Sequence, residues 1–360
     1  MEPKPLIGPD AAAKLNPLVL TTGHFSPGEA ASFCAGQPDE IRRRIGEAEL
    51  LYYRGEIREA SERFQALSDS EDFSGSIASL LCRSICALAD GNVHTLLDNY
   101  RSVKLLRGIL PQDDPLRSMT EYYLLYVNIL IHNVPDIHFP QFGIDAFSVP
   151  AALKPMAFYA YAHYLMEIGD IGRAIGMAEG ALILSGRDYP IAEIDLCLLI
   201  STGYMLRAAW DKAEYYFRHA WEKAKPDGLL MPFAEHRRML FGMLEKCLRY
   251  EEPAAYKRIQ ELAVSYHKHW VFVHNELTGD TITDSLTNGR APSCTNTIPF
   301  GEKPAAASVL SALKTEDSRS FPPAVNTIFV FLERLLISRS EKRAFSASVF
   351  RPSGCVMTKN

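Results

Sequence analysis

Histidine and cysteine side chains are the first candidates for chemistry, because they act as metal ligands, nucleophiles and general bases. The ten histidines show no metal-binding spacing. His267 and His269 are two residues apart, which places them on different faces of a helix, and no His-Glu-x-x-His motif occurs. Cys82 and Cys86 are four residues apart among leucine and isoleucine, as small core residues are. We therefore expect no metal site.

Motifs for phosphate binding and hydrolysis are also missing from the sequence. It contains no Gly-rich loop that ends in Lys-Ser/Thr. It also contains no Gly-x-Ser-x-Gly segment of the kind that presents a nucleophilic serine. The sequence predicts no catalytic residue and no cofactor, and a protein that is not an enzyme.

Side chains suited to binding lie between the apolar positions of several expected helices. In stacked helix pairs the first helix of each pair lines a concave face, so its intervening side chains would face a groove. Tyrosine and histidine suit a groove that takes a peptide, a partner helix or a small apolar ligand. The predicted groove residues are Arg42, Glu49, Tyr52, Tyr53, Tyr159, His163, Glu167, Asp195 and Thr202. Packing against neighbouring repeats is the alternative interpretation for Tyr52 and Tyr159, and the favoured one for Met205.

The elements that would position these residues are repeated pairs of helices. Residues 157–184 show helical spacing of apolar residues on either side of Gly169-Asp170, a pair typical of a turn between helices. Similar units have their turns at positions 55, 91 and 208. The interval between 91 and 169 is twice the usual one and predicts a degenerate unit there. Its first helix would be 116–131, and the proline-rich stretch 135–150 would be an irregular insert.

The best copies carry a family resemblance. The strings Gly55-Ile57-Ala60-Phe64 and Trp210-Ala213-Phe217-Ala220 resemble the tetratricopeptide repeat, which is about 34 residues long. The resemblance implies an all-α helical solenoid of antiparallel helix pairs over residues 41–276. It says little about function, because the motif residues are the packing residues of the solenoid.

Residues 228–287 carry a second, more specific resemblance. Apolar stripes predict helices over 231–250 and 254–270, which we expect to form a terminal pair that closes the array. The segments LLMPFAEHRRMLFGMLEKCL, YKRIQELAVSYHKHW and VHNELTGDTITDSLT resemble the end of the helical sensor region in large LuxR-type transcription regulators. In that family the pair equivalent to Leu286-Thr287 opens a helix-turn-helix domain that binds DNA.

The tail departs from that family after position 287. The expected Pro-x-Glu and Asn-x-Glu-Ile-Ala motifs are replaced by NGRAPSCTNTIPFGEKPAAASVL. Residues 325–328 resemble the start of a recognition helix, but the apolar run 329–331 follows where polar side chains would meet DNA. Basic residues outnumber acidic ones from 289 onward, which is compatible with phosphate contacts or with a solubilising tail. A reading-frame change near codon 288 is a third interpretation, and the DNA-binding residues are unknown.

The amino-acid composition indicates the general class of the protein. The apolar fraction of 47% and the charged fraction of 22% are those of a globular protein. No apolar run reaches the roughly 18 residues of a membrane span, and no secretory signal pattern is present, so we expect a cytoplasmic protein without a membrane partner. The expected order is an N-terminal segment 1–40, repeats 41–276, a linker 277–290 and a poorly ordered tail 291–360.

Three functions follow from these patterns. The leading one is a non-enzymatic module that binds a protein, a peptide or a small molecule in its groove and is related to LuxR-type sensor regions. The alternatives are a DNA-binding regulator with a divergent helix-turn-helix and a structural adaptor between proteins with no DNA role. Self-association into a homo-oligomer is compatible with all three.

Overall fold

The part of the chain that the structure describes is all-helical, as the sequence predicts. The computed structural model describes residues 18–68, 73–110, 115–133, 149–185, 189–240, 242–279 and 281–282, and these contain no strand. The α-helices are α2 (Ala30–Ala35), α3 (Glu40–Tyr53), α4 (Ile57–Ser68), α5 (Phe73–Asp90), α6 (Val93–Ile109), α7 (Pro115–Leu130), α9 (Lys154–Glu167), α10 (Ile171–Leu184), α11 (Pro190–Leu206), α12 (Trp210–Ala224), α13 (Met231–Glu235), α14 (Met243–Leu248) and α15 (Pro253–Thr278). Two short 3₁₀ helices, η3 (Ala151–Leu153) and η4 (Lys225–Asp227), join them.

Several sequence predictions fall outside these ranges. The insert predicted at 135–150 lies outside the described residues except for its last two. Most of the predicted linker and the whole predicted tail, including the recognition-helix resemblance at 325–328, also lie outside them. Within the described ranges, no helix combines the length and the apolarity that crossing a lipid bilayer requires.

The five turns that join the paired helices share one geometry. Gly55, Gly91 and Gly169 have φ between 78° and 82°, and Ala208 has φ 55°. The turn of the degenerate unit is now located, because His132 has φ 53° at the matching place after α7. At each turn the next backbone N–H bonds to a carbonyl five residues earlier, at 2.8–2.9 Å, which closes the end of the first helix.

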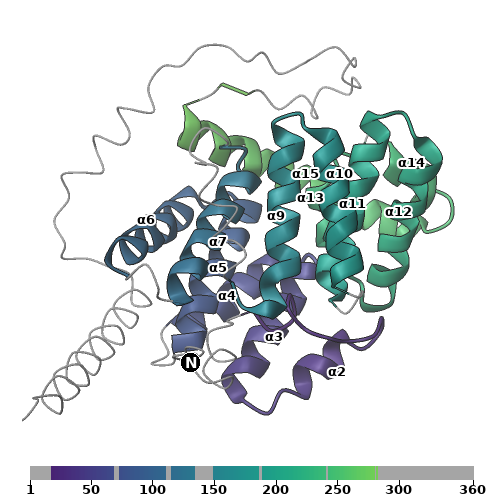
Figure 1. Cartoon of the computed structure of the whole chain (residues 1–360). Coiled ribbons are helices and arrows are strands. Elements are labelled where there is room, and N and C mark those ends of the chain that lie inside the picture. Colours follow the sequence, from purple (N-terminus) through teal and green to yellow (C-terminus); the bar gives the residue numbers. More distant parts are fainter. Residues whose placement is uncertain are drawn as a thin grey trace, which may run out of the picture.

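The alanine and phenylalanine residues of the repeat motif lie in the core, as predicted, whereas Trp210 is 50% exposed. Ala60 and Phe64 of α4 and Ala213 and Phe217 of α12 have no exposed surface. Each small residue lets the paired helix approach, and each phenylalanine fills the space beside it. The sequential pairs α3–α4, α5–α6, α9–α10 and α11–α12 pack side by side along the chain (Figure 1).

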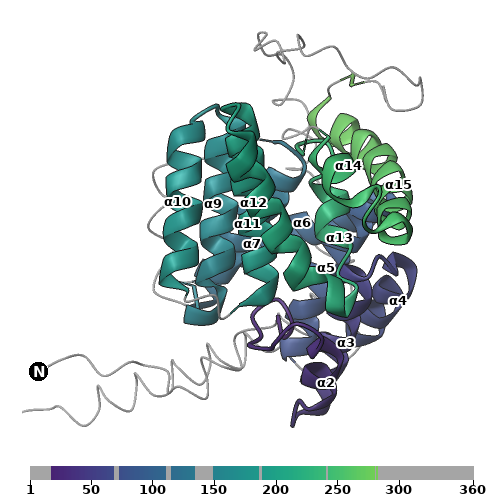
Figure 2. The ribbon, with the colours of Figure 1, turned by 90° about the vertical axis from the view of Figure 1, so that its right-hand side faces the viewer.

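The last helices do not form the terminal pair that the sequence predicts. The predicted helix 231–250 is two short helices, because Gly242 has φ 90°, outside the helical range, and starts α14. Helices α13 and α15 pack on each other, and they also contact α3 and α5 near the start of the chain. Figure 2 shows α13 and α15 beside α3, α4 and α5, opposite the layer of α9, α10, α11 and α12. The described helices therefore fold back on themselves.

Helix α15 is fixed by hydrogen bonds to the ends of two earlier helices. Nδ1 of His269 donates to the carbonyl of Ala89 at 2.7 Å, and Nε1 of Trp270 donates to the carbonyl of Leu130 at 2.7 Å. These carbonyls belong to the last turns of α5 and α7, where intrahelical donors run out. Two adjacent residues of α15 thus bind the C-terminal ends of α5 and α7.

The segment before α3 also connects distant parts of the chain. The carboxylate of Asp227 accepts from the backbone N–H of Gly28 at 2.7 Å and of Ala30 at 2.9 Å. Arg54 donates to the carbonyl of Asp227 at 3.0 Å. Residues about 200 positions apart are thereby joined at the start of α2.

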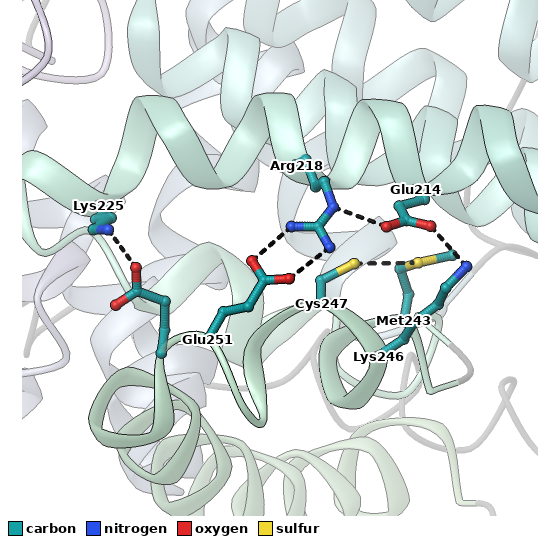
Figure 3. A network of polar contacts seen from close by, with 8 residues as sticks. Glu214, Arg218, Lys225, Met243, Lys246, Cys247 and Glu251 are labelled. Atoms are coloured by element: carbon teal, nitrogen blue, oxygen red, sulfur yellow. Dashed lines mark hydrogen bonds and ion pairs between the residues drawn. The ribbon is translucent and has the colours of Figure 1, made fainter.

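A surface network holds α14 against α12 (Figure 3). Arg218 binds both carboxylate oxygens of Glu251, at 2.8 and 2.9 Å, and donates to Glu214 at 2.8 Å. Lys246 contacts the other oxygen of Glu214 at 2.7 Å. A bidentate arginine with a second carboxylate fixes geometry better than a single surface pair does. The network therefore positions the segment that carries α13 and α14.

Candidate ligand-binding site

Glu49, Thr202 and Tyr53 do not face an open groove, contrary to the sequence prediction. Glu49 is buried and accepts from the backbone N–H groups of Val19, Leu20 and Thr21 at 2.7, 2.8 and 3.2 Å. Its Oε1 also binds the Thr21 hydroxyl, which contacts the Tyr53 hydroxyl at 2.8 Å. The Thr202 hydroxyl donates to the carbonyl of Leu198 at 3.0 Å. The segment 18–22 therefore covers part of this face, and Glu49 and Tyr53 border a smaller pocket instead of an open groove.

Arg42 and Glu167 are only partly buried. Arg42 is half-buried in the first turn of α3. Glu167 is half-buried at the end of α9, where its Oε2 lies 3.0 Å from Nδ1 of His132. Burial opposes ionisation of Glu167, but His132 and His163 outweigh it and lower the pKa of this carboxyl. Glu167 is thus an ion-pair partner within the chain.

Four predicted residues do come together, but inside the molecule. Tyr52, Tyr159, His163 and Asp195 are all buried. They come from α3, α9 and α11, which are the first helices of their pairs. The sequence analysis expected residues of these helices to share a face. Because α13 and α15 lie against that face, it is an interior wall rather than an exposed groove.

A pocket opens among α3, α5, α7 and α9. Its empty volume of about 540 Å³ includes the solvent space at its mouth, so the enclosed part is much smaller. Its wall is mainly apolar, with Phe64, Ile85 and Met156 among the lining residues. The polar groups of the wall come from five tyrosines, one threonine and one acid: Tyr52, Tyr53, Tyr122, Tyr123, Tyr126, Thr21 and Glu49. Such a mainly apolar pocket with a few polar groups is typical of small-molecule sites.

Two carboxylates adjoin the tyrosines of this pocket. Oε1 of Glu235 accepts a hydrogen bond from the hydroxyl of Tyr52. Burial raises the pKa of Glu235 to about 7, against the effect of that hydrogen bond. Burial, and then the charge of Glu235, raise the pKa of Asp195 well above its usual range. Asp195 in turn contributes to a raised pKa of Tyr126, after burial and the charge of Glu235.

A hydrogen-bond chain borders the carboxylates. Nδ1 of His236 lies 2.7 Å from the carbonyl of Pro232, so it must donate, which leaves Nε2 to accept from the Tyr159 hydroxyl at 3.0 Å. The Tyr159 oxygen lies 3.3 Å from Nδ1 of His163. Burial and the neighbouring His163 lower the pKa of His236 to about 3, so its ring is neutral. Nε2 of His163 is 3.5 Å from Glu167, too long for a good hydrogen bond.

Sequence reasoning missed Glu235, His236, Tyr122, Tyr126 and Tyr266. The first two lie in α13, which we assigned to a terminal pair, and Tyr266 lies in α15. The available signals were a Glu-His pair directly after the apolar stretch 229–234, and Tyr122 and Tyr126 four residues apart on one helix face. None of these patterns reveals that α13 and α15 return to α3.

The comparisons with known proteins add no relative: no family model, no curated protein and no solved structure matches the chain. The site therefore has to be interpreted from its own geometry.

Proposed function

We propose that this chain is a non-catalytic, tetratricopeptide-like sensor module that binds a small molecule in the pocket between α3, α5, α7 and α9. The observation that carries the proposal is the pocket itself, which combines an apolar wall with tyrosines near two carboxyl groups, the buried Asp195 and the half-buried Glu235. The recurring turns and the buried motif residues support the tetratricopeptide-like assignment. Its relation to LuxR-type sensor regions rests on the sequence resemblance alone.

A small ligand fits this site better than a peptide or partner helix does. The groove that a peptide would occupy is filled by α13 and α15. Binding in the remaining pocket would tighten contacts among α3, α5, α7 and α9, which belong to different helix pairs. A ligand would thereby shift the population of the closed arrangement, which is how a sensor transmits binding.

The test uses three probes of similar size and different charge: 2-phenylethanol, 2-phenylethylammonium and 3-phenylpropanoate. Isothermal titration calorimetry with the full chain should detect binding of at least one probe, with a Kd of about 1 mM or tighter. Ile85→Phe, which places extra volume in the pocket, should weaken that binding, whereas Leu105→Phe on the exposed face of α6 should not. Absence of binding by all three probes contradicts the proposal.

A further inference from the structure

The five fully buried acidic residues of the described chain differ in their partners. Glu49 and Asp227 accept hydrogen bonds from backbone N–H groups, as shown above. Glu121 pairs with Arg107, and Glu193 lies 2.9 Å from Lys223. Asp195 is only 4% exposed, yet within the described ranges its carboxylate has no hydrogen bond and no ion pair.

Tyrosine hydroxyls beside Asp195 are also left without partners. Tyr122 and Tyr266 are 3% and 8% exposed, and neither hydroxyl has a hydrogen-bond partner among the residues that the structure describes. Buried polar atoms in a folded protein normally have a partner. The carboxylate of Asp195 and these two hydroxyls are not among the completely enclosed polar atoms of the described residues, so they border space that a polar group from outside could fill.

The ionisable groups beside this space that can carry charge are acidic. The only charged group that acts on the Asp195 carboxyl from the described part of the chain is Glu235. Glu235 is itself bound by a neutral tyrosine, Tyr52. The neighbouring His236 is held neutral by burial. Two carboxylates in a low-dielectric interior without a cation are costly, because a buried charge needs a counter-charge.

Tyrosines from four helices gather near Glu235, and Tyr52 contacts it directly through its hydroxyl. Tyr52 of α3, Tyr126 of α7, Tyr159 of α9 and Tyr266 of α15 all lie within electrostatic reach of Glu235. The rings of Tyr126 and Tyr159 have their centroids 6.4 Å apart. Tyrosine faces attract cations, and several of them together form the kind of site that recognises ammonium groups.

We propose that this space binds the ammonium group of an organic cation, with Asp195 and Glu235 as counter-charges and the four tyrosines as its cage. The proposal deepens the sensor function and rests on it. Tyr52 and Tyr126 also line the 540 Å³ pocket, so an apolar or aromatic tail on the amine would extend there. A metal ion fits less well, because ring faces are poor ligands and cations such as Mg²⁺ and Ca²⁺ need six or more oxygens.

Cation binding here must compete with protons. The groups that face Asp195 and Glu235 are tyrosines from α3, α7, α9 and α15 and the neutral His236. In the free protein, protons are therefore taken up by the two carboxylates themselves. An ammonium ion favours their charged forms. Its affinity should therefore rise as the pH rises from 6 to 8, a range in which an alkylamine stays protonated.

The experiment compares the three probes by calorimetry on the full chain and on two charge variants. We expect 2-phenylethylammonium to bind the wild type at least about tenfold more tightly than 2-phenylethanol, since the alcohol lacks the charge. Asp195→Asn should remove at least about tenfold of the amine's affinity and leave that of the alcohol unchanged. Glu222→Gln, which removes a negative charge from the exposed face of α12, is the matched control and should change neither.

The possible results separate the two proposals. Equal binding of amine and alcohol, unaffected by Asp195→Asn, overturns the cation site but leaves a small-molecule pocket in place. Preference for 3-phenylpropanoate likewise overturns the cation site alone. Absence of binding by all three overturns both. Should Asp195→Asn unfold, Tyr126→Leu against Tyr126→Phe gives the same test, because only the second keeps the aromatic face.

Discussion

Two buried carboxylates, Glu49 of α3 and Asp195 of α11, have opposite surroundings. Glu49 receives three backbone N–H groups and a hydroxyl from the segment 18–22. Asp195 receives nothing from the described residues, and its nearest charge is another acid, Glu235. The difference teaches that burial of a charge does not identify a site. What identifies it is whether the chain itself supplies the partner.

The largest effect should come from removing the satisfied carboxylate. Glu49→Ala leaves three buried N–H groups of the segment 18–22 without an acceptor and should lower the free energy of unfolding by about 3–5 kcal/mol. Urea denaturation followed by circular dichroism measures it. Glu47→Ala removes a partly exposed ion pair with Arg63 and should cost less than about 1 kcal/mol. Equal, small costs for both variants would show that Glu49 is not an anchor.

The free energy of unfolding, measured over a pH series, should reveal the abnormal ionisation of Glu235. Because the folded pKa of Glu235, about 7, exceeds the usual value of 4.5, this group favours folding at low pH and loses that contribution as the pH rises from about 4.5 to 7. Glu235→Gln keeps an acceptor for Tyr52 but does not titrate. The stability of this variant relative to wild type should therefore rise across that window by up to about 3 kcal/mol.

The stability of Glu235→Gln has to be compared with that of wild type, because the ionisation of His236 changes stability with pH in the opposite direction. Its pKa is lowered to about 3, so it favours folding above the usual pKa of 6.5 and loses that contribution as the pH falls. This contribution is present in both proteins and cancels in the comparison. A pH-independent difference would mean that the Glu235 carboxyl is fully hydrated.

A pair of tyrosine variants should show the same contrast for hydroxyl groups. Tyr159→Phe breaks the hydrogen-bond chain to His236 and His163 and should cost about 1–2 kcal/mol. Tyr122→Phe removes a hydroxyl that has no partner among the described residues and should change stability by less than about 0.5 kcal/mol. Thermal denaturation of both variants measures the difference. Similar losses would indicate that Tyr122 has a hydrogen-bond role as well.

The smallest effect should come from neutralising the unsatisfied carboxylate. Asp195→Asn removes a buried charge that nothing in the described chain compensates, so at pH 8 stability should stay unchanged or rise by about 1 kcal/mol. Chemical denaturation of the variant and of wild type at pH 8 provides the measurement. A loss of several kcal/mol would reveal a structural partner and would make Asp195 equivalent to Glu49.

The helical class and the position of the turns were predictable from local sequence. Apolar spacing located the paired helices, and the doubled interval between Gly91 and Gly169 predicted a further helix, which is α7 with a turn at His132 after it. These predictions succeeded because they depend on periodicity and on residues close together in the chain. Motif residues such as Phe64 and Phe217 were correctly assigned to packing for the same reason.

The surroundings of the predicted groove residues were not predictable in this way. The sequence placed Glu49, Asp195 and Tyr52 on one face, but whether that face is open depends on what covers it. The covering elements are the segment 18–22 and the helices α13 and α15, which have no periodic signal linking them to α3. Long-range contacts of this kind, such as that between Tyr52 and Glu235, arise only from the three-dimensional fold.

The ionisation of Glu235 tests the central claim most directly, because a carboxyl enclosed by the protein with no cationic side chain acting on it from the described residues should titrate abnormally. Carbon-13 NMR of glutamate side-chain carboxyls, with the Glu235 signal assigned by its loss in Glu235→Gln, would follow this group from pH 4 to 8. The account predicts a midpoint near 7 in the free protein, moving to lower pH when 2-phenylethylammonium is added. A midpoint near 4.5 that the amine does not change would contradict it.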